Sequence, residues 1–338
     1  ARPEEELLAD LAKAIDMVRD FLSQRDASLD DIIQQTGFAR NAAIVAAKEA
    51  ANQSDESRKQ FEIMCREVFK KFKACLNIKS INQYRDDRDA IDIVYKSLQQ
   101  DREQADISSI MRQLHQVVDD AIETASGSEE EEQALYDISQ IDFDRLRQEF
   151  RKNATPNTTV QNLKQAVEQK LQRLLAQNPL RTDFQQHYEQ LVAEYNLQKD
   201  QATIERTFDT LLELIQDLDE EEGRAAREGL DEESLAIFDL LKKQQLSPAE
   251  IKQIKTVSVS LLEQLKTKID QIDQWRDKEP TRDSIKVTIR DFLWAEETGL
   301  PVSSYSEEDV GVKAENVFAH VFRSYPLIPS PYYMASLG

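Results

Sequence analysis

The chain runs SPAEIKQIKTVSVSLLEQLKTKIDQI from Ser247 to Ile272. Ser247 offers the side-chain oxygen of an N-cap, Pro248 suits the first helical position, and Glu250 completes a capping box. Apolar residues then recur at steps of three and four, which places them on one face of a helix. They are Ile251, Ile254, Val257, Leu261, Leu262, Leu265, Ile269 and Ile272. The stretch predicts a long helix that buries one side.

The same spacing recurs along most of the chain. It predicts a helix from about residue 4 to residue 24 and a core helix after Gln53. Further apolar stripes lie at residues 91–98, 107–122, 163–175, 204–218, 285–293 and 310–322. Gly (7) and Pro (9) are scarce, and no alternating strand pattern occurs. We expect an all-α fold of multi-helix bundles, elongated and divided into two helical subdomains.

A stretch of small and acidic residues marks the main domain boundary. Residues 125–132 run ASGSEEEE, which offers nothing to bury against a core. We therefore expect a helical domain at residues 1–125, an acidic linker at 126–140 and a C-terminal helical domain at 141–326. The tail, residues 327–338, follows Pro326 and is expected to fray.

The charge balance limits the partners that the chain can have. Acidic residues number 64 and basic residues 43, so the formal net charge is −21, which repels a phosphate backbone over most of the surface. Cys65 and Cys75 are the only cysteines and lie in one apolar helical stripe, so neither a disulfide framework nor a four-ligand zinc site is expected. No run of about 18 apolar residues and no basic leader followed by an apolar stretch occurs, which favours a cytoplasmic protein that enters no membrane.

Motifs that carry catalysis are missing from the sequence. The seven glycines are isolated, so they form no loop that cradles phosphate. His115, His187 and His320 belong to no metal-binding motif, and none follows a Glu at the spacing used in carboxylate-rich helical metalloenzymes. We expect no catalytic residue and no metal site, and we interpret the histidines as structural.

A basic stretch stands out against the acidic background. Residues 58–73 contain six basic residues and only two acidic ones. Arg66, Lys70, Lys71 and Lys73 are therefore candidates for DNA contact. The alternative is that these residues form the solvated side of an amphipathic helix.

A second group combines an aromatic residue with arginines. Trp275, Arg276, Arg282 and Arg290, together with Phe318 and Phe322, are candidates for binding a protein partner, because aromatic and arginine side chains dominate interfaces. The alternative is that the aromatic residues belong to the core, with the Trp at a corner between two helices.

Several segments resemble a known family, and they occur in the family's order. They are Arg227–Leu241, the Ser247–Glu250 helix start, the Gln274–Arg276 turn, Thr281–Arg290 and Val317–Phe322. These segments resemble the C-terminal domain of the motor subunits of type I restriction enzymes. Upstream, SDESRKQFEIMCREVFKKFKACL, QYRDDRDAIDIVYKSLQ and ADISSIMRQLHQVVDDAI are similar to the helical segment that follows the second motor domain. The resemblance covers nearly all of the chain.

The resemblance implies a role in assembly. In such a restriction subunit the nuclease and the two ATP-driven translocase domains lie upstream, so ATP and magnesium are expected there and no cofactor is expected in this chain. Residues 1–125 would then be a spacer, and residues 141–326 would dock the motor onto the methyltransferase and specificity subunits, with DNA in the full complex. The resemblance assigns no catalytic residue to any position. A free-standing helical scaffold or adaptor remains the alternative.

Overall fold

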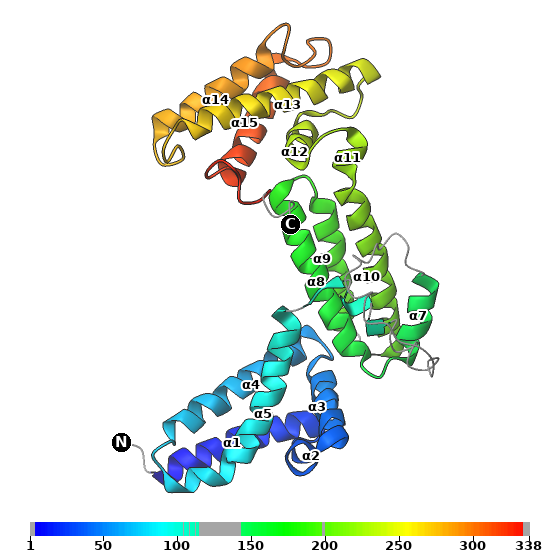
Figure 1. Cartoon of the computed structure of the whole chain (residues 1–338), viewed down its shortest axis with the longest axis vertical. Helices are drawn as coiled ribbons and strands as arrows, with labels where there is room; N and C mark the ends of the chain where they lie inside the picture. The colour runs from blue at the N-terminus through cyan, green and yellow to red at the C-terminus, as the bar shows by residue number, and fades with distance from the viewer. Residues whose placement is uncertain are drawn as a thin grey trace, which may run out of the picture. The chain divides into compact units, whose positions relative to one another are not determined.

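The computed structural model describes residues 4–103, 105–107, 109–111, 113–114, 143–197 and 200–333. All regular elements in these ranges are helices, so the predicted all-α fold is confirmed (Figure 1). The chain divides into two compact units. Unit 1 holds residues 1–168 and 188–216, and unit 2 holds residues 169–187 and 217–338.

Unit 1 begins with a core of short and long helices. They are α1 (Glu4–Ser23), α2 (Leu29–Gln34), α3 (Gly37–Ala51), α4 (Asp55–Ala74), the 3-10 helix η1 (Lys79–Tyr84) and α5 (Arg85–Glu103). α1 packs on α4, and α5 packs on α2, α3 and α4. The stripe predicted after Gln53 lies on α4, where Phe61, Cys65 and Val68 are fully buried. This core is made of residues 11–98 alone.

The rest of unit 1 comes from α7 (Phe143–Lys152) and from parts of three long helices, α8 (Pro156–Gln177), α9 (Thr182–Leu197) and α10 (Gln201–Glu222). Phe150 of α7 stacks on Phe208 of α10 with 3.9 Å between the ring centroids. These three helices also enter unit 2, because the division falls after residues 168, 187 and 216.

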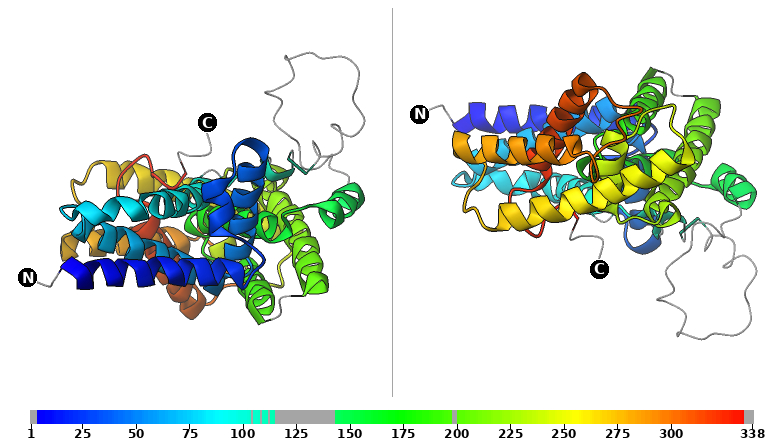
Figure 2. Two further views of the ribbon diagram at one scale, coloured as in Figure 1. Left: turned by 90° about the horizontal axis from the view of Figure 1, so that it is seen from below. Right: turned by 90° about the horizontal axis from the view of Figure 1, so that it is seen from above.

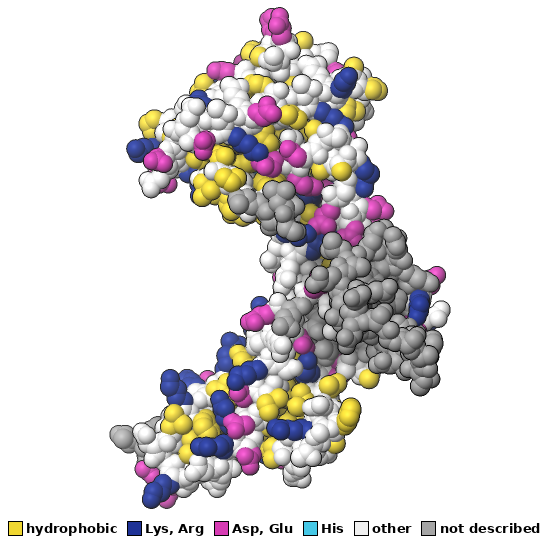
Figure 3. Space-filling view, in the orientation of Figure 1, with side chains coloured by type: hydrophobic (Ala, Val, Ile, Leu, Met, Phe, Trp, Pro, Cys, Tyr) yellow, Lys and Arg dark blue, Asp and Glu magenta, His cyan; other side chains and the backbone are white. Residues whose placement is uncertain are grey.

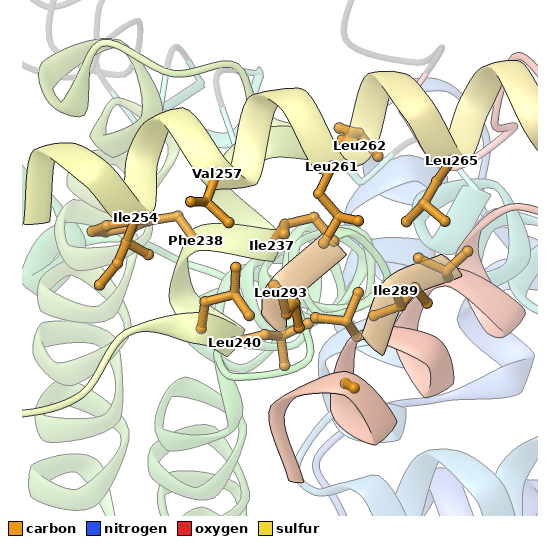
Figure 4. Close-up of a cluster of buried hydrophobic side chains, with 14 of the residues drawn as sticks. Ile237, Phe238, Leu240, Ile254, Val257, Leu261, Leu262, Leu265, Ile289 and Leu293 are labelled. Atoms are coloured by element: carbon orange, nitrogen blue, oxygen red, sulfur yellow. The ribbon is translucent and has the colours of Figure 1, made fainter. Parts of the chain in front are cut away.

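Unit 2 is completed by α11 (Arg224–Glu228), α12 (Glu232–Leu241), α13 (Pro248–Asp270), α14 (Glu279–Trp294) and α15 (Glu307–Ser324). The helix predicted at Ser247 is confirmed, with both halves of the capping box formed. α13 and α14 run side by side and α15 packs on α14 (Figure 2). Their apolar stripes meet in one core, in which Ile254, Val257 and Leu261 of α13 lie against α12 and α14 (Figure 4).

Part of the tail predicted at residues 327–338 lies in the described ranges. Residues 327–333 do not fray: Tyr333 is buried, its ring stacks on Tyr325 and its hydroxyl donates a hydrogen bond to the Gln177 carbonyl. Ser330 is also buried and donates to the Ser324 carbonyl. Prolines suggest an irregular chain, but the tyrosine rings supply apolar area that fixes it against the helices.

Some predicted features lie outside the described residues. The acidic linker at 126–140, His115 and the second half of the helix expected at 107–122 are among them. The predicted domain boundaries therefore stay predictions, and the compact units of the structure divide the chain at other positions. Within the described ranges, no helix is long and apolar enough to cross a membrane.

Candidate docking surface

The turn between α13 and α14 positions Trp275. Gln274 takes a left-handed backbone conformation with φ of 51°, and the Thr281 hydroxyl donates to the Trp275 carbonyl at 2.6 Å. The indole is 1% exposed, and its Nε1 donates to the Tyr325 carbonyl at 2.8 Å. Trp275 is therefore a core residue, which corrects its prediction as a direct partner contact: the turn directs the ring inward, where its N–H is paired.

Two phenylalanines of α15 flank the buried indole. The Phe318 and Phe322 rings lie nearly perpendicular to it, with centroids 6.4 and 5.8 Å away. Phe322 keeps 37% of its surface exposed, whereas Phe318 is half-buried. Figure 3 shows hydrophobic side chains on the surface beside the end of α15. Trp275 thus supports an aromatic surface that its neighbours present to solvent.

Cationic side chains border these rings. The Arg276 guanidinium lies 5.6 Å from the centre of the Phe322 ring and donates to the Phe322 carbonyl at 3.0 Å. Arg282 in turn donates to the Arg276 carbonyl at 2.8 Å, and Lys286 Nζ lies 4.7 Å from the centre of the Phe318 ring. We call this group the aromatic–arginine cluster: Trp275, Arg276, Arg282, Lys286, Phe318 and Phe322.

The structure brings together five of the six residues predicted for partner binding. The exception is Arg290, which pairs with Glu307 at 3.6 Å, both side chains being well exposed. Lys286, which was not chosen as a candidate, joins the cluster. The sequence contained one signal for including Lys286: it lies four residues after Arg282, and residues four apart on a helix share a face.

The residues predicted for DNA contact lie in unit 1, on α4. Arg66, Lys70 and Lys73 are exposed, and Lys71 is half-buried. Arg66 and Lys70 reach Glu62 and Glu67 at 3.9 and 3.8 Å, the outer limit of an ion pair. The structure therefore leaves most of their charge available to a partner.

Unit 1 also holds a polar cavity that the sequence did not reveal. Its volume is about 370 Å³, and α4, α5, α8 and α9 contribute its lining. Lys164 Nζ lies 2.6 Å from Asp55 Oδ1 and 4.8 Å from the centre of the Tyr195 ring. Burial lowers the pKa of the Lys164 ammonium; burial alone would raise the pKa of Asp55, but the Lys164 charge holds it below its usual value.

The chemistry of this cavity is structural. Asn196 donates to Asp55 Oδ2 at 3.0 Å, and the Tyr188 hydroxyl donates to the Lys164 carbonyl at 3.1 Å. The pair thus ties the first turn of α4 to α8 and α9. No signal in the sequence pointed to it, because the partners are more than 100 residues apart.

In the described ranges no three His, Cys, Asp or Glu side chains lie close enough to hold a metal ion. His320 is buried, 3.2 Å from the Tyr333 hydroxyl and 3.3 Å from the Ser324 hydroxyl, and His187 is exposed. His320 therefore has the structural surroundings that the sequence indicated.

Comparison with known proteins places the chain in a family. A family model described as the C-terminal part of proteins like the HindI endonuclease subunit of a type I restriction enzyme matches residues 1–318. No curated protein and no solved structure matches the chain. Because the match covers nearly the whole chain, this protein belongs to the family of C-terminal regions of type I restriction enzyme HindI endonuclease subunit-like proteins.

Proposed function

We propose that this chain is an assembly module that docks the endonuclease subunit onto the methyltransferase and specificity subunits of a type I restriction enzyme. The family supports a role within such an enzyme. The proposed complex handles DNA in the cytoplasm. We propose that its ATP and magnesium serve motor domains outside this chain, which needs no cofactor of its own.

The observation that carries the docking proposal is the construction of the aromatic–arginine cluster. The Phe322 ring, which is 37% exposed, packs against the fully buried Trp275. Arg276 lies over the Phe322 ring and donates a hydrogen bond to the Phe322 carbonyl. Interface hot spots combine an aromatic or arginine anchor with support that limits its motion before binding. The cluster meets both conditions with side chains already in place.

Capture by the partner subunits tests this proposal. The complete chain, bound to a sensor surface, is exposed to the methyltransferase–specificity complex from the same source. The double variant Arg276→Ala, Phe322→Ala is expected to weaken capture at least tenfold, since truncating one hot-spot residue typically costs more than about 1 kcal/mol. Trp275 is left intact because its removal would disturb the core.

A matched control separates docking from general effects of losing a cation and a phenylalanine. The control residues lie in unit 1. Phe38 on α3 is 96% exposed, and Lys13 on α1 is exposed as well. The variant Lys13→Ala, Phe38→Ala should bind like the unmodified chain. Equal capture by the cluster variant would reject this surface, and no capture of the intact folded chain would favour the free-standing scaffold.

A further inference from the structure

One face of α4 carries a row of exposed cations. Lys59, Arg66, Lys70 and Lys73 are exposed. At 100° per residue these four positions fall within about 60° of one another around the helix, and at 1.5 Å per residue they span about 21 Å. The row is therefore straight and narrow.

The structure changes the residue set that the sequence suggested. Lys71 is half-buried and projects about 100° away from Lys70 around the helix. Lys59, two turns before Arg66, takes its place on the exposed face. We call Lys59, Arg66, Lys70 and Lys73 the α4 cationic row.

The row is poorly neutralised by the protein. Its two pairs, Arg66 with Glu62 and Lys70 with Glu67, measure 3.9 and 3.8 Å. Among the residues that the structure describes, Lys59 and Lys73 form no ion pair within 4 Å. Residues 58–73 carry six basic and two acidic side chains in a chain whose net charge is −21. Figure 3 shows Lys and Arg side chains gathered over α4 and α5.

We infer that the α4 cationic row binds the phosphate backbone of double-stranded DNA without reading bases. A protein partner is less suited to it, because lysine is depleted from interface cores and the row contains no aromatic anchor. Phosphates need a positive charge within reach and little fixed geometry, which exposed lysines supply. The choice of DNA as the polyanion rests on the proposed function, whereas the binding of a polyanion rests on the row alone.

The test measures binding of the complete chain to a fluorescein-labelled 30-base-pair duplex by anisotropy. Four phosphate contacts predict a log–log salt slope of about −3.6, so affinity should fall roughly 100-fold between 50 and 200 mM salt. The variant Lys70→Glu, Lys73→Glu should weaken binding at 50 mM at least tenfold. Lys13→Glu, Lys252→Glu makes the same change in net charge at exposed positions on α1 and α13 and should lose less than threefold.

The outcomes separate this inference from the docking proposal. A DNA affinity that does not change with salt concentration would overturn the row as a DNA site. So would an equal loss of DNA affinity in the two charge-reversal variants. Concentration-dependent dimerisation abolished by Lys70→Glu, Lys73→Glu, with no DNA binding, would reassign the row to an interface between copies. Circular dichroism confirms that each variant is folded. Capture by the methyltransferase–specificity complex should be unchanged in the row variant, so either proposal can fail alone.

Discussion

At the scale of single residues, burial determines the protonation state of a polar side chain in the core. His320 is 2% exposed, and its ring nitrogens face the Ser324 and Tyr333 hydroxyls. Burial, followed by the nearby Arg323 charge, lowers the pKa of the imidazole to about 4. The folded protein therefore keeps this ring neutral at pH values where an unfolded chain protonates it.

His320 predicts a pH dependence of stability. The unfolded imidazole has a pKa near 6.5, so between about pH 6.5 and pH 4 the unfolded state binds more protons and stability falls as the pH is lowered. From pH 7 to pH 5 the loss is about 2 kcal/mol. Urea unfolding at both pH values measures it. His320→Gln should flatten this part of the profile, whereas His187→Gln, at an exposed histidine, should leave it unchanged; a profile unaltered by His320→Gln would contradict the assignment.

At the scale of elements, the helix starts are fixed by local chemistry. Ser247 accepts a hydrogen bond from the Glu250 N–H at 3.3 Å, and the Glu250 carboxylate accepts from the Ser247 N–H at 2.8 Å. Hydrogen bonds from the Ser304 hydroxyl, and then from Ser247, lower the pKa of Glu250 to about 2. Ser306 and Asp309 repeat the arrangement at α15. These signals lie within four residues and are therefore visible in the sequence.

Removing the cap of α13 tests this element. Ser247→Ala should lower the free energy of unfolding by about 1 kcal/mol, because it leaves an N–H of the first turn without its acceptor. Ser247→Asp keeps an acceptor and a favourable charge at the helix start, so it should cost much less. Urea denaturation compares the three proteins. Equal stability of Ser247→Ala and the parent chain would mean that packing alone holds the end of α13.

At the scale of the whole molecule, the described residues include two large apolar cores, besides the buried apolar side chains of α7 to α10. One is formed by residues 11–98 of α1 to α5, and the other by residues 225–333. The buried members of the first core all lie between Leu11 and Leu98. Hydrogen bonds connect the helices of this core with later ones, such as the Tyr195 hydroxyl donating to the Asn52 carbonyl at 3.2 Å. The Glu49 carboxylate likewise accepts from the Asn157 and Thr158 N–H groups at 2.6 and 2.8 Å.

This organisation predicts the behaviour of a fragment. Residues 4–103 should fold alone into a helical, cooperatively melting protein, because hydrophobic burial is the dominant stabilising term and all buried members of this core lie within the fragment. The fragment should melt below the full chain, since Asp55 and Glu49 lose their partners on α8. Circular dichroism follows the melting. A helical fragment that melts without cooperativity would show that the core needs the later helices.

The sequence by itself determined the features that depend on neighbours in the chain. Apolar spacing located α1, α4, α5, α8, α10 and α13 to α15, but it did not predict α3, α7 or α9. Caps located the starts of α13 and α15. The segments that resemble the family, taken in order, indicated the family whose model matches residues 1–318. Five of the six residues predicted for partner binding lie in one cluster. Trp275 and Arg276 lie in the turn before α14, Arg282 donates back to the Arg276 carbonyl from α14, and Phe318 and Phe322 share a face of α15. The docking role of that cluster stays a prediction.

The tertiary structure decided what depends on distant contacts. It buried Trp275 against Tyr325, paired Arg290 with Glu307, fixed Tyr333 against Gln177 and paired Lys164 with Asp55. Helical periodicity reports which face of a helix is apolar, but it does not report which other helix covers that face. Whether an aromatic ring is core or surface, and whether a lysine meets a carboxylate, follows only when segments remote in the chain have packed together.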